Sequence, residues 1–422
     1  MAKTTPIARV KRDQYQYFVG PDISPAIEID SGQEVMVETM DCFSGAITNN
    51  AQRFNTIADY IKASRGPLPV AGPIVVKGAV RGDVLAVHVL DIRVGMDGGR
   101  AITMVTPFFG GLRNPHTMVP ELGPDTKVCQ IRGDVIDFPL KDRMVQLPVR
   151  PMIGTIWSAP AREKRLANVH DAFNCGNIDC PELSPGNTIY LPVSTPGGMI
   201  SLGDVHACMG DSEITGYSME TAADVYLRID LIKQEENHYL NCPQIESERT
   251  IGSVGCHFGQ PLGDNVKAAF HDMLMRLHRF YGFTVLDAYE LLGQVGEVRV
   301  HQTFLLTTIM PFWSNWTRDT LYDFTSRNLW QTRISVWYPT SLLELLPNES
   351  SPDRRENGLP VSGTLCSLST RNRRFLNMVP SNDLWWSLHS IFLKSPSETV
   401  EKDEFVNRVL PHNLQFLVCL IG

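Results

Sequence analysis

The sequence contains no run of roughly eighteen apolar residues, so we expect no membrane-spanning helix. Its first residues carry no apolar segment of the kind found in a secretory signal. The nine cysteines are odd in number and spread singly along the chain, which indicates reduced thiols rather than a disulfide framework. These absences predict a cytoplasmic protein that has no membrane partner.

The sequence also lacks a basic excess and the common catalytic motifs. It has 38 lysines and arginines against 46 aspartates and glutamates, a net charge of -8, which argues against nucleic acid as a partner. It contains no P-loop, no Gly-x-Gly-x-x-Gly, no His-Glu-x-x-His and no Gly-x-Ser-x-Gly. Any chemistry must therefore be sought in residues that are scattered along the chain.

A repeated strand pattern dominates the first half of the sequence. A glycine, a polar residue and then alternating apolar positions recur at residues 32–37, 82–87 and 186–191. Each repeat predicts a tight turn that leads into a strand. Residues 225–231 alternate in the same way and predict a strand with one dry face. We therefore expect this part of the chain to be mainly β.

Helical periodicity begins late. Apolar residues at intervals of three and four predict a helix over residues 264–281, with Asp264 as N-cap and Gly282 after its end. A second helix is predicted to start at Thr284 and to be stopped by Gly293. A late pair of helices thus follows the β-rich part.

The composition changes after about residue 302. Six of the seven tryptophans lie beyond this point, and no periodic pattern places them in one core. We predict one domain over residues 1–302 and a C-terminal extension of unknown fold over residues 303–422. The extension is expected to pack loosely, and its composition also fits a misassigned reading frame.

The segment 203–213 is the richest in chemical groups. Its charged and imidazole side chains, which are costly to bury unpaired, are Asp204, His206, Asp211 and Glu213. Gly203 and Gly210 interrupt any helix and allow the backbone to turn tightly. We therefore predict a site loop that aims several oxygen and nitrogen atoms at one point.

Two further polar clusters precede this segment. Glu38 and Asp41 follow an apolar strand, and Glu38 faces away from the apolar side, toward a possible groove. A turn-capping role is the alternative for Asp41. Asn177 and Asp179 lie two residues apart, on one side of an extended chain. A local Asx-turn is the simpler role for Asn177.

Three carboxylate clusters and one histidine suit a divalent cation with oxygen and nitrogen ligands. We predict that they converge around His206, because isolated buried carboxylates would be very costly. A hydrogen-bonded structural role is the alternative for His206. Cys175 and Cys180 form a Cys-x4-Cys pair, which is a weak zinc signal without a second pair.

Several segments, taken in order, resemble the acetamidase/formamidase family of short aliphatic amide hydrolases. The similarity covers roughly residues 8–301 and rests on residues 37–41, 73–79 with Gly82 and Asp83, 154–156, 176–179, 191–193, 203–207 with Gly210, Asp211 and Glu213, and 296–298. A chance match in this order is improbable, since the segments span most of the first three hundred residues.

The resemblance implies an α+β fold that is mainly β, with a sandwich- or barrel-like body. It implies hydrolysis of the carbon–nitrogen bond of formamide- or acetamide-type substrates to a carboxylic acid and ammonia, by a metal-activated water. A divalent metal ion, zinc or calcium, and a homo-oligomer are also implied. By this resemblance the catalytic residues are Glu38, Asp211 and Glu213. The substrate-binding residues are Asn177 and Gly210, and the metal ligands are Asp41, Asp179 and His206.

Four positions differ from the family pattern. Trp157, Cys175 and Ser212 stand where glycine is usual, and Met209 replaces a polar residue. One alternative is therefore a catalytically degenerate binding or scaffold protein that keeps the fold. Another is an amidase that uses Cys175 or Cys208 as nucleophile. The hypothesis of a metal-assisted amide hydrolase is the leading one of the three.

Overall fold

The computed structural model describes residues 7–64, 66–112, 121–234, 240–303 and 310–314. Within these ranges the fold is mainly β, as predicted, and it contains three helices, of which the late pair was predicted. No helix among them is long and apolar enough to cross a membrane. Nearly all of the predicted C-terminal extension lies outside the described residues, so its loose packing stays a prediction.

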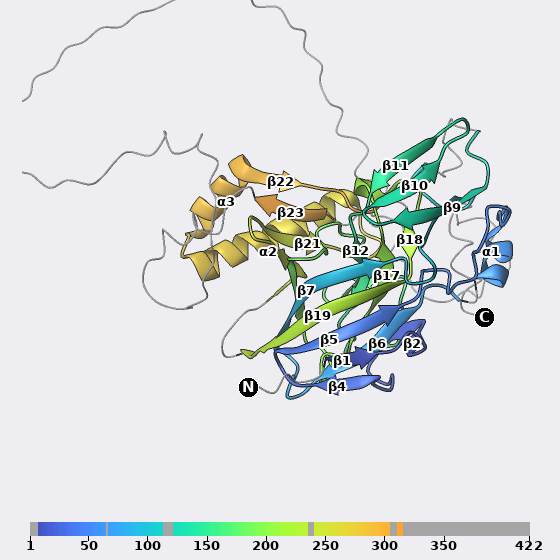
Figure 1. The fold of residues 1–422 in the computed structure, drawn as a ribbon. Coiled ribbons are helices and arrows are strands. Elements are labelled where there is room, and N and C mark those ends of the chain that lie inside the picture. Colours follow the sequence, from blue (N-terminus) through green and yellow to red (C-terminus); the bar gives the residue numbers. More distant parts are fainter. Residues whose placement is uncertain (1–6, 65, 113–120, 235–239, 304–309, 315–422) are drawn as a thin grey trace, which may run out of the picture. The chain divides into compact units, whose positions relative to one another are not determined.

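One large sheet contains the strands that the glycine pattern predicted. In spatial order its described strands are β1 (Ala8–Val10), β5 (Gln33–Thr39), β19 (Ala223–Ile232), β7 (Val84–Val94), β16 (Thr188–Pro192), β20 (Gln244–Glu246), β21 (Ile251–Gly255), β23 (Met310–Ser314) and β22 (Gly296–Val298). Figure 1 shows β7, β19, β5 and β1 side by side in one layer. The predicted strands at residues 32–37, 82–87, 186–191 and 225–231 all fall in this sheet.

The second sheet carries most of the polar clusters. Its described strands run in the order β11 (Met144–Pro148), β10 (Val135–Pro139), β9 (Asp125–Arg132), β8 (Arg100–Val105), β18 (Glu220–Thr221), β17 (Ile200–His206), β12 (Met152–Trp157), β15 (Cys175–Asn177) and β14 (His170–Asp171). β6 (Val70–Val76) also pairs with β17, and it joins β2 (Tyr15–Gln16) and β4 (Ile27–Ile29) to the sheet. β3 (Phe18–Val19) and β13 (Arg165–Leu166) form a separate small pair.

The two large sheets enclose a common hydrophobic core. Val37 of β5 and Val225 of β19 are paired in register and fully buried, because the apolar side of their alternation faces inward. They belong to one apolar cluster with Ile153 and Val205 of the second sheet. This arrangement confirms the predicted sandwich-like body. It also places β17 against the core, which matters for the site below.

The prediction of a site loop over residues 203–213 is wrong for its first part. Residues 203–206 complete β17, and all seven residues of this strand are buried. The strand needs glycine at residue 203, because a side-chain carbon there would lie 2.4 Å from the carbonyl oxygen of Pro69. Its charged side chains are buried because they partner one another, a possibility that the alternation of apolar residues cannot reveal.

The late helix pair is confirmed, with small corrections. α2 (Leu262–Tyr281) begins two residues before Asp264, which lies in its first turn instead of capping it, and Gly282 ends it in the left-handed conformation at φ 73°. α3 (Val285–Val295) is capped by the Thr284 side chain and runs through Gly293. The residues on both sides of Gly293 are helical, so this single glycine lowers the stability of α3 without ending it.

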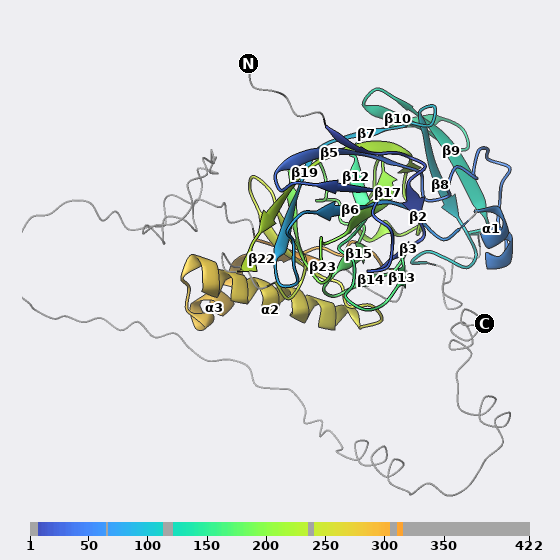
Figure 2. The same cartoon turned by 90° about the horizontal axis from the view of Figure 1, so that it is seen from below.

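The helices form a small core of their own. Ala269 and Met273 of α2 pack with Ala288 and Leu292 of α3, and Ile251 of β21 completes the group. Figure 2 shows α2 beside β22 and β23, and α2 also packs against β21. A third helix, α1 (Ile57–Ala63), was not predicted and contains no buried residue. None of these helices supplies a residue to the site described next.

Candidate metal centre and pocket

The last residue of β17, His206, lies at the centre of a buried group of carboxylates. Its imidazole Nε2 is 3.3 Å from Glu220 Oε2, 3.6 Å from Asp204 Oδ1 and 4.0 Å from Asp179 Oδ1. His206 faces Glu220 directly, since β17 and β18 pair these two residues in an antiparallel register. The side chains of all four residues are at most 6% exposed.

Glu213 is the fifth member of this group. It lies in the short helical turn Asp211–Glu213 and is 5% exposed. Its carboxylate and the ligand atoms of His206 and Glu220 all lie within 4.8 Å of one another, and the same holds for Asp179, Asp204 and His206. We call these five residues the His206 cluster. The predicted convergence of Asp179, His206 and Glu213 is therefore observed.

Burial and mutual repulsion dominate the electrostatics of the His206 cluster. Burial, reinforced by Asp204, raises the pKa of Asp179 to about 8. Burial likewise raises the pKa of Glu220 and raises that of Glu213 well above its usual range. For His206, burial opposes the charged ring, but Glu220 and Asp204 outweigh it and the pKa is raised well above its ordinary value. Such a site strongly favours added positive charge.

Several polar side chains orient the carboxylates from outside. The Thr155 hydroxyl donates a hydrogen bond of 3.1 Å to Asp204 Oδ2, and the Gln302 amide donates to Asp179 Oδ2. With its amide nitrogen turned toward the carboxylates, Asn177 donates to Asp179 at 3.0 Å and to Asp204 at 3.3 Å. These bonds hold Asp179 and Asp204 in fixed orientations, as the outer partners of a metal site do.

Some polar atoms at the centre lack hydrogen-bond partners. Within the described residues, neither ring nitrogen of His206 makes a hydrogen bond, and neither does Glu220 Oε2. Unsatisfied buried polar atoms are rare in native proteins and call for an explanation. A cation between the imidazole and the carboxylates would engage His206 Nε2 and Glu220 Oε2, so the donor set fits a divalent metal ion.

Gly154 of β12 leaves the space that the cluster occupies. A side-chain carbon at this position would lie 2.6 Å from the Asp204 carbonyl oxygen and 2.7 Å from Asp179 Oδ1. Its backbone carbonyl also accepts hydrogen bonds from the backbone N–H groups of Ile178 and Asp179. The absence of a side chain at residue 154 therefore allows Asp179 to approach Asp204.

A pocket of about 270 Å³ opens beside the cluster. It is lined by residues of β8, β9, β10 and the segment 210–219, which are Thr103, Met104, Val105, Asp125, Lys127, Phe138, Gly210, Asp211, Glu213, Ile214, Thr215, Tyr217, Ser218 and Met219. Glu213 belongs both to this lining and to the His206 cluster. The predicted residues Gly210 and Asp211 line the pocket, and Asp211 is paired with Arg299.

Two predicted site residues are not among the side chains gathered around His206. Glu38 is paired with the Arg9 guanidinium and accepts a hydrogen bond of 3.2 Å from the Arg12 backbone N–H. Asp41 is buried, and its Oδ1 accepts hydrogen bonds of 2.9 Å from the backbone N–H groups of Phe43 and Gly45. Asp41 therefore caps a turn in this structure, which was the alternative interpretation of this residue.

Sequence reasoning missed several residues of the site. Glu220, Gln302, Thr155 and Gly154 were not predicted, and Asp204 was noted in its segment without a role. The signal for Glu220 was a lone carboxylate in the otherwise uncharged stretch 214–223. Its position opposite His206 depends on strand pairing across the intervening loop, which the sequence pattern does not reveal.

The positions that differ from the family pattern lie outside the pocket lining. Trp157 is fully buried, and its indole N–H donates a hydrogen bond of 3.0 Å to the Ala167 carbonyl oxygen. Ser212 has a φ of 74° and its backbone N–H donates to the Val300 carbonyl. Burial raises the pKa of the Cys175 and Cys208 thiols, which disfavours the thiolate that a nucleophile needs. These features give no support to a cysteine nucleophile.

Curated relatives match the chain over part of their length. The formamidase of Methylophilus methylotrophus is 28% identical over 265 residues, which cover 52% of this chain and 64% of the relative. The acetamidase of Mycolicibacterium smegmatis is 26% identical over 265 residues, which cover 50% of this chain and 64% of the relative. The aligned part thus spans slightly less than two thirds of these proteins.

Solved structures match more completely. The acetamidase of Yersinia enterocolitica aligns with a TM-score of 0.67 and 30% identity, covering 76% of this chain and 94% of that one. The acetamidase of Bacillus halodurans aligns with a TM-score of 0.66 and 27% identity, covering 75% and 99%. A sequence model of the acetamidase/formamidase family matches residues 7–121 and 141–316. The chain therefore belongs to the acetamidase/formamidase family.

Proposed function

We propose that this protein hydrolyses the carbon–nitrogen bond of small linear amides, of the formamide or acetamide type, to a carboxylic acid and ammonia by a metal-activated water. The observation that carries the proposal is the buried His206 cluster, which reaches the pocket through Glu213. The relatives named formamidase and acetamidase support the substrate class. Cytoplasmic location and a homo-oligomeric state are part of the same proposal.

Asp179, Asp204, His206 and Glu220 are the residues that would hold the metal ion. Zinc accepts both carboxylate and imidazole ligands. Calcium is the second choice, because it prefers oxygen ligands and the imidazole offers nitrogen. A bound divalent ion supplies a hydroxide-like nucleophile near neutral pH, and it stabilises negative charge on the carbonyl oxygen. The unsatisfied Nε2 of His206, which faces these carboxylates, supports this assignment.

Glu213 is the proposed general base and acid. It belongs both to the His206 cluster and to the pocket lining, so its carboxylate can take a proton from the attacking water and deliver it to the leaving nitrogen. Burial raises its pKa, which makes the protonated form accessible for the second transfer. Asn177 and Gln302 hold the neighbouring carboxylates and act as positioning residues.

The size and lining of the pocket favour short acyl groups. Its volume of about 270 Å³ is below the roughly 300–1,000 Å³ of pockets for drug-sized ligands. Met104, Phe138, Tyr217 and Met219 supply apolar surface to the lining. Gly210 and Asp211 stay in the proposal as residues of the pocket wall. Glu38 and Asp41 are proposed to support the framework, given their partners described above.

Removal of the metal tests this proposal directly. We expect a strong chelator to abolish ammonia release from formamide and acetamide, and zinc or calcium to restore it. His206→Ala should lose the metal bound at the His206 cluster together with the activity, whereas the exposed substitution Glu34→Gln should change neither. Full activity in metal-free protein would exclude this mechanism and revive the cysteine nucleophile. Tight metal binding without hydrolysis of any short amide would favour the degenerate binding protein.

A further inference from the structure

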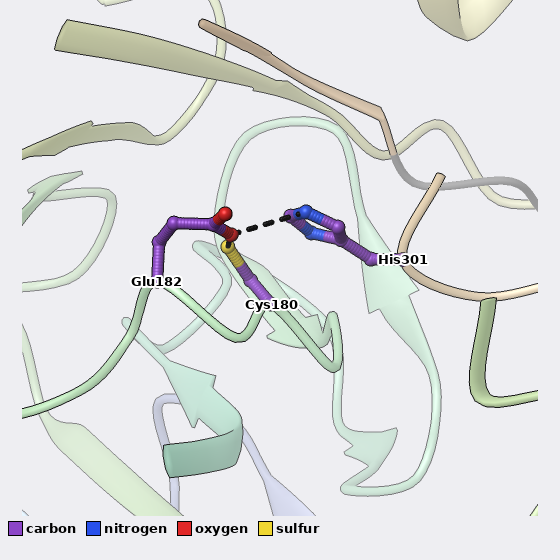
Figure 3. A group of neighbouring side chains, drawn as sticks. All are labelled: Cys180, Glu182 and His301. Atoms are coloured by element: carbon purple, nitrogen blue, oxygen red, sulfur yellow. Dashed lines mark hydrogen bonds and ion pairs between the residues drawn. The ribbon is translucent and has the colours of Figure 1, made fainter. Parts of the chain in front are cut away.

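A second group of metal-ligating side chains lies outside the His206 cluster. Cys180 and Glu182 come from the segment between β15 and β16, and His301 follows β22 in the chain (Figure 3). Cys180 and His301 are 0% exposed, and the Glu182 side chain is 12% exposed. The group shares no residue with the His206 cluster and takes no part in the function proposed above.

The three ligand atoms already converge. Figure 3 shows the thiol and the imidazole both directed at the Glu182 carboxylate. Cys180 Sγ is 3.2 Å and His301 Nε2 is 3.1 Å from Glu182 Oε2, and all three ligand atoms lie within 4.8 Å of one another. Tetrahedral zinc, with bonds of about 2.0–2.3 Å, separates its ligand atoms by about 3.3–3.6 Å. The two distances to Glu182 Oε2 are therefore close to those of ligands that share one zinc ion.

The histidine supplies a second, independent observation. Neither ring nitrogen of His301 makes a hydrogen bond within the described part of the chain, although the ring is completely buried. A buried imidazole without partners is unfavourable unless something else engages it. Its Nε2 faces Glu182 Oε2 closely but without hydrogen-bond geometry, as two ligands of one ion do.

We propose that Cys180, Glu182 and His301 bind a zinc ion at a site separate from the His206 cluster. One thiolate and one carboxylate balance the charge of a divalent cation, and the sulfur and nitrogen donors select zinc over calcium or magnesium. The Arg299 guanidinium binds the other oxygen, Glu182 Oε1, and so orients the carboxylate toward the ion. Water takes the fourth position of the ion.

The ion would act through its position in the fold. It ties the segment after β22 to the loop that carries Asp179, at the point where Gln302 donates to the Asp179 carboxylate. Zinc at this place would restrain both residues next to the ligands, Asp179 and Gln302. The competing arrangement is a hydrogen-bonded triad of thiol, carboxylate and imidazole that holds no metal.

Cobalt substitution of the full-length protein tests the proposal, because a thiolate–cobalt bond gives a charge-transfer band in the near ultraviolet. We expect this band in the wild-type protein and in His206→Ala, and its loss in Cys180→Ser. By elemental analysis, Cys180→Ser should carry one zinc per chain fewer than the wild type. Cys129→Ser is the matched control, since Cys129 is buried but belongs to none of the metal-ligating groups among the described residues.

The outcomes separate the two arrangements. Absence of the thiolate–cobalt band from the wild-type protein would overturn the proposal, and so would an unchanged zinc content in Cys180→Ser. Should Cys180→Ser fail to fold, the wild-type spectrum and the zinc content of Glu182→Gln still decide. Failure of the His206 site would appear separately, as a loss of ammonia release with the thiolate–cobalt band retained.

Discussion

The concentration of buried charge is the main feature of this protein at the scale of single residues. Four carboxylates and one imidazole share a site that is nearly inaccessible to water. Desolvation makes each charge costly alone, and the carboxylates repel one another. The strand and turn residues around them therefore maintain an arrangement that becomes favourable only with a cation or with bound protons.

Glu213→Gln tests the proposed acid and base role. The amide keeps the shape of the side chain but cannot accept the proton, so we expect kcat for acetamide to fall about 10²- to 10⁴-fold. Metal content should stay unchanged, because four other residues of the cluster remain. Steady-state ammonia release and elemental analysis measure the two effects. A variant that keeps full kcat would move the base role to another carboxylate.

Gly154→Ala tests how closely the cluster is packed. The added methyl group would meet the Asp204 carbonyl oxygen and Asp179 Oδ1 within 3 Å, so we expect a loss of about 1–3 kcal/mol in the free energy of unfolding. Metal affinity should fall as well. Gly263→Ala in α2 is the control, since no atom lies within 4 Å of its added carbon. Equal stability of the two variants would contradict the packing argument.

Part of the site was predictable from the sequence, because some of its residues lie in segments with a recognisable local pattern. Asp179, His206 and Glu213 are polar residues in glycine-containing segments, and the structure brings them together. Glu38 looks similar in sequence, but in β5 it lies beside Arg9, which satisfies its charge. Glu220 has only a weak local signal, a lone carboxylate in an uncharged stretch, and its proximity to His206 arises from the pairing of β17 and β18.

At the scale of elements, the alternation of apolar residues predicts half-buried strands well and fully buried strands poorly. β19 alternates between buried and partly exposed residues and was predicted. β17 is buried on both sides and carries Asp204 and His206, so its sequence resembles a loop. The reason is physical, because a charged side chain is stable in a buried strand only when residues from other strands pair with it.

Asp83, in the turn between β6 and β7, provides a pH-dependent test of a structural element. Its carboxylate is 2.6 Å from Lys233 Nζ, and it accepts hydrogen bonds from the backbone N–H groups of Val80 and Gln234. Burial opposes ionisation, but Lys233 and these N–H groups outweigh it and lower the pKa. We expect Asp83→Asn to cost about 1–3 kcal/mol of unfolding free energy at pH 7.

The sign of the pH dependence follows from the lowered pKa. The contribution of Asp83 is present above the unfolded-state pKa of about 3.9 and is lost as the pH falls through the lower folded-state value. The difference between wild type and Asp83→Asn should therefore be constant from pH 7 to about 4 and shrink below that. Urea unfolding at several pH values measures it, with the exposed Asp134→Asn as control. A difference that grows toward acid pH would refute the assignment.

At the scale of the whole molecule, the fold class was predictable but the strand order was not. Glycine turns, alternation and helix caps identify most elements one at a time. The neighbours of β17 are β6, β12 and β18, which come from three separate parts of the chain. Their pairing depends on burying the shared core around Ile153, Leu202 and Val205, a property of the folded chain that no single segment encodes.

The order of strands also determines where the chain can be shortened. β23 lies between β21 and β22 in the first sheet, and it follows the predicted domain boundary at residue 302. Truncation after Gln302 would leave β21 and β22 with unpaired edges, so we expect a less stable protein that is prone to aggregate. Truncation after Ser314 keeps β23 and should preserve metal content, ammonia release and melting temperature. Loss of metal and activity from the protein ending at Ser314 would mean that residues beyond it contribute to the site.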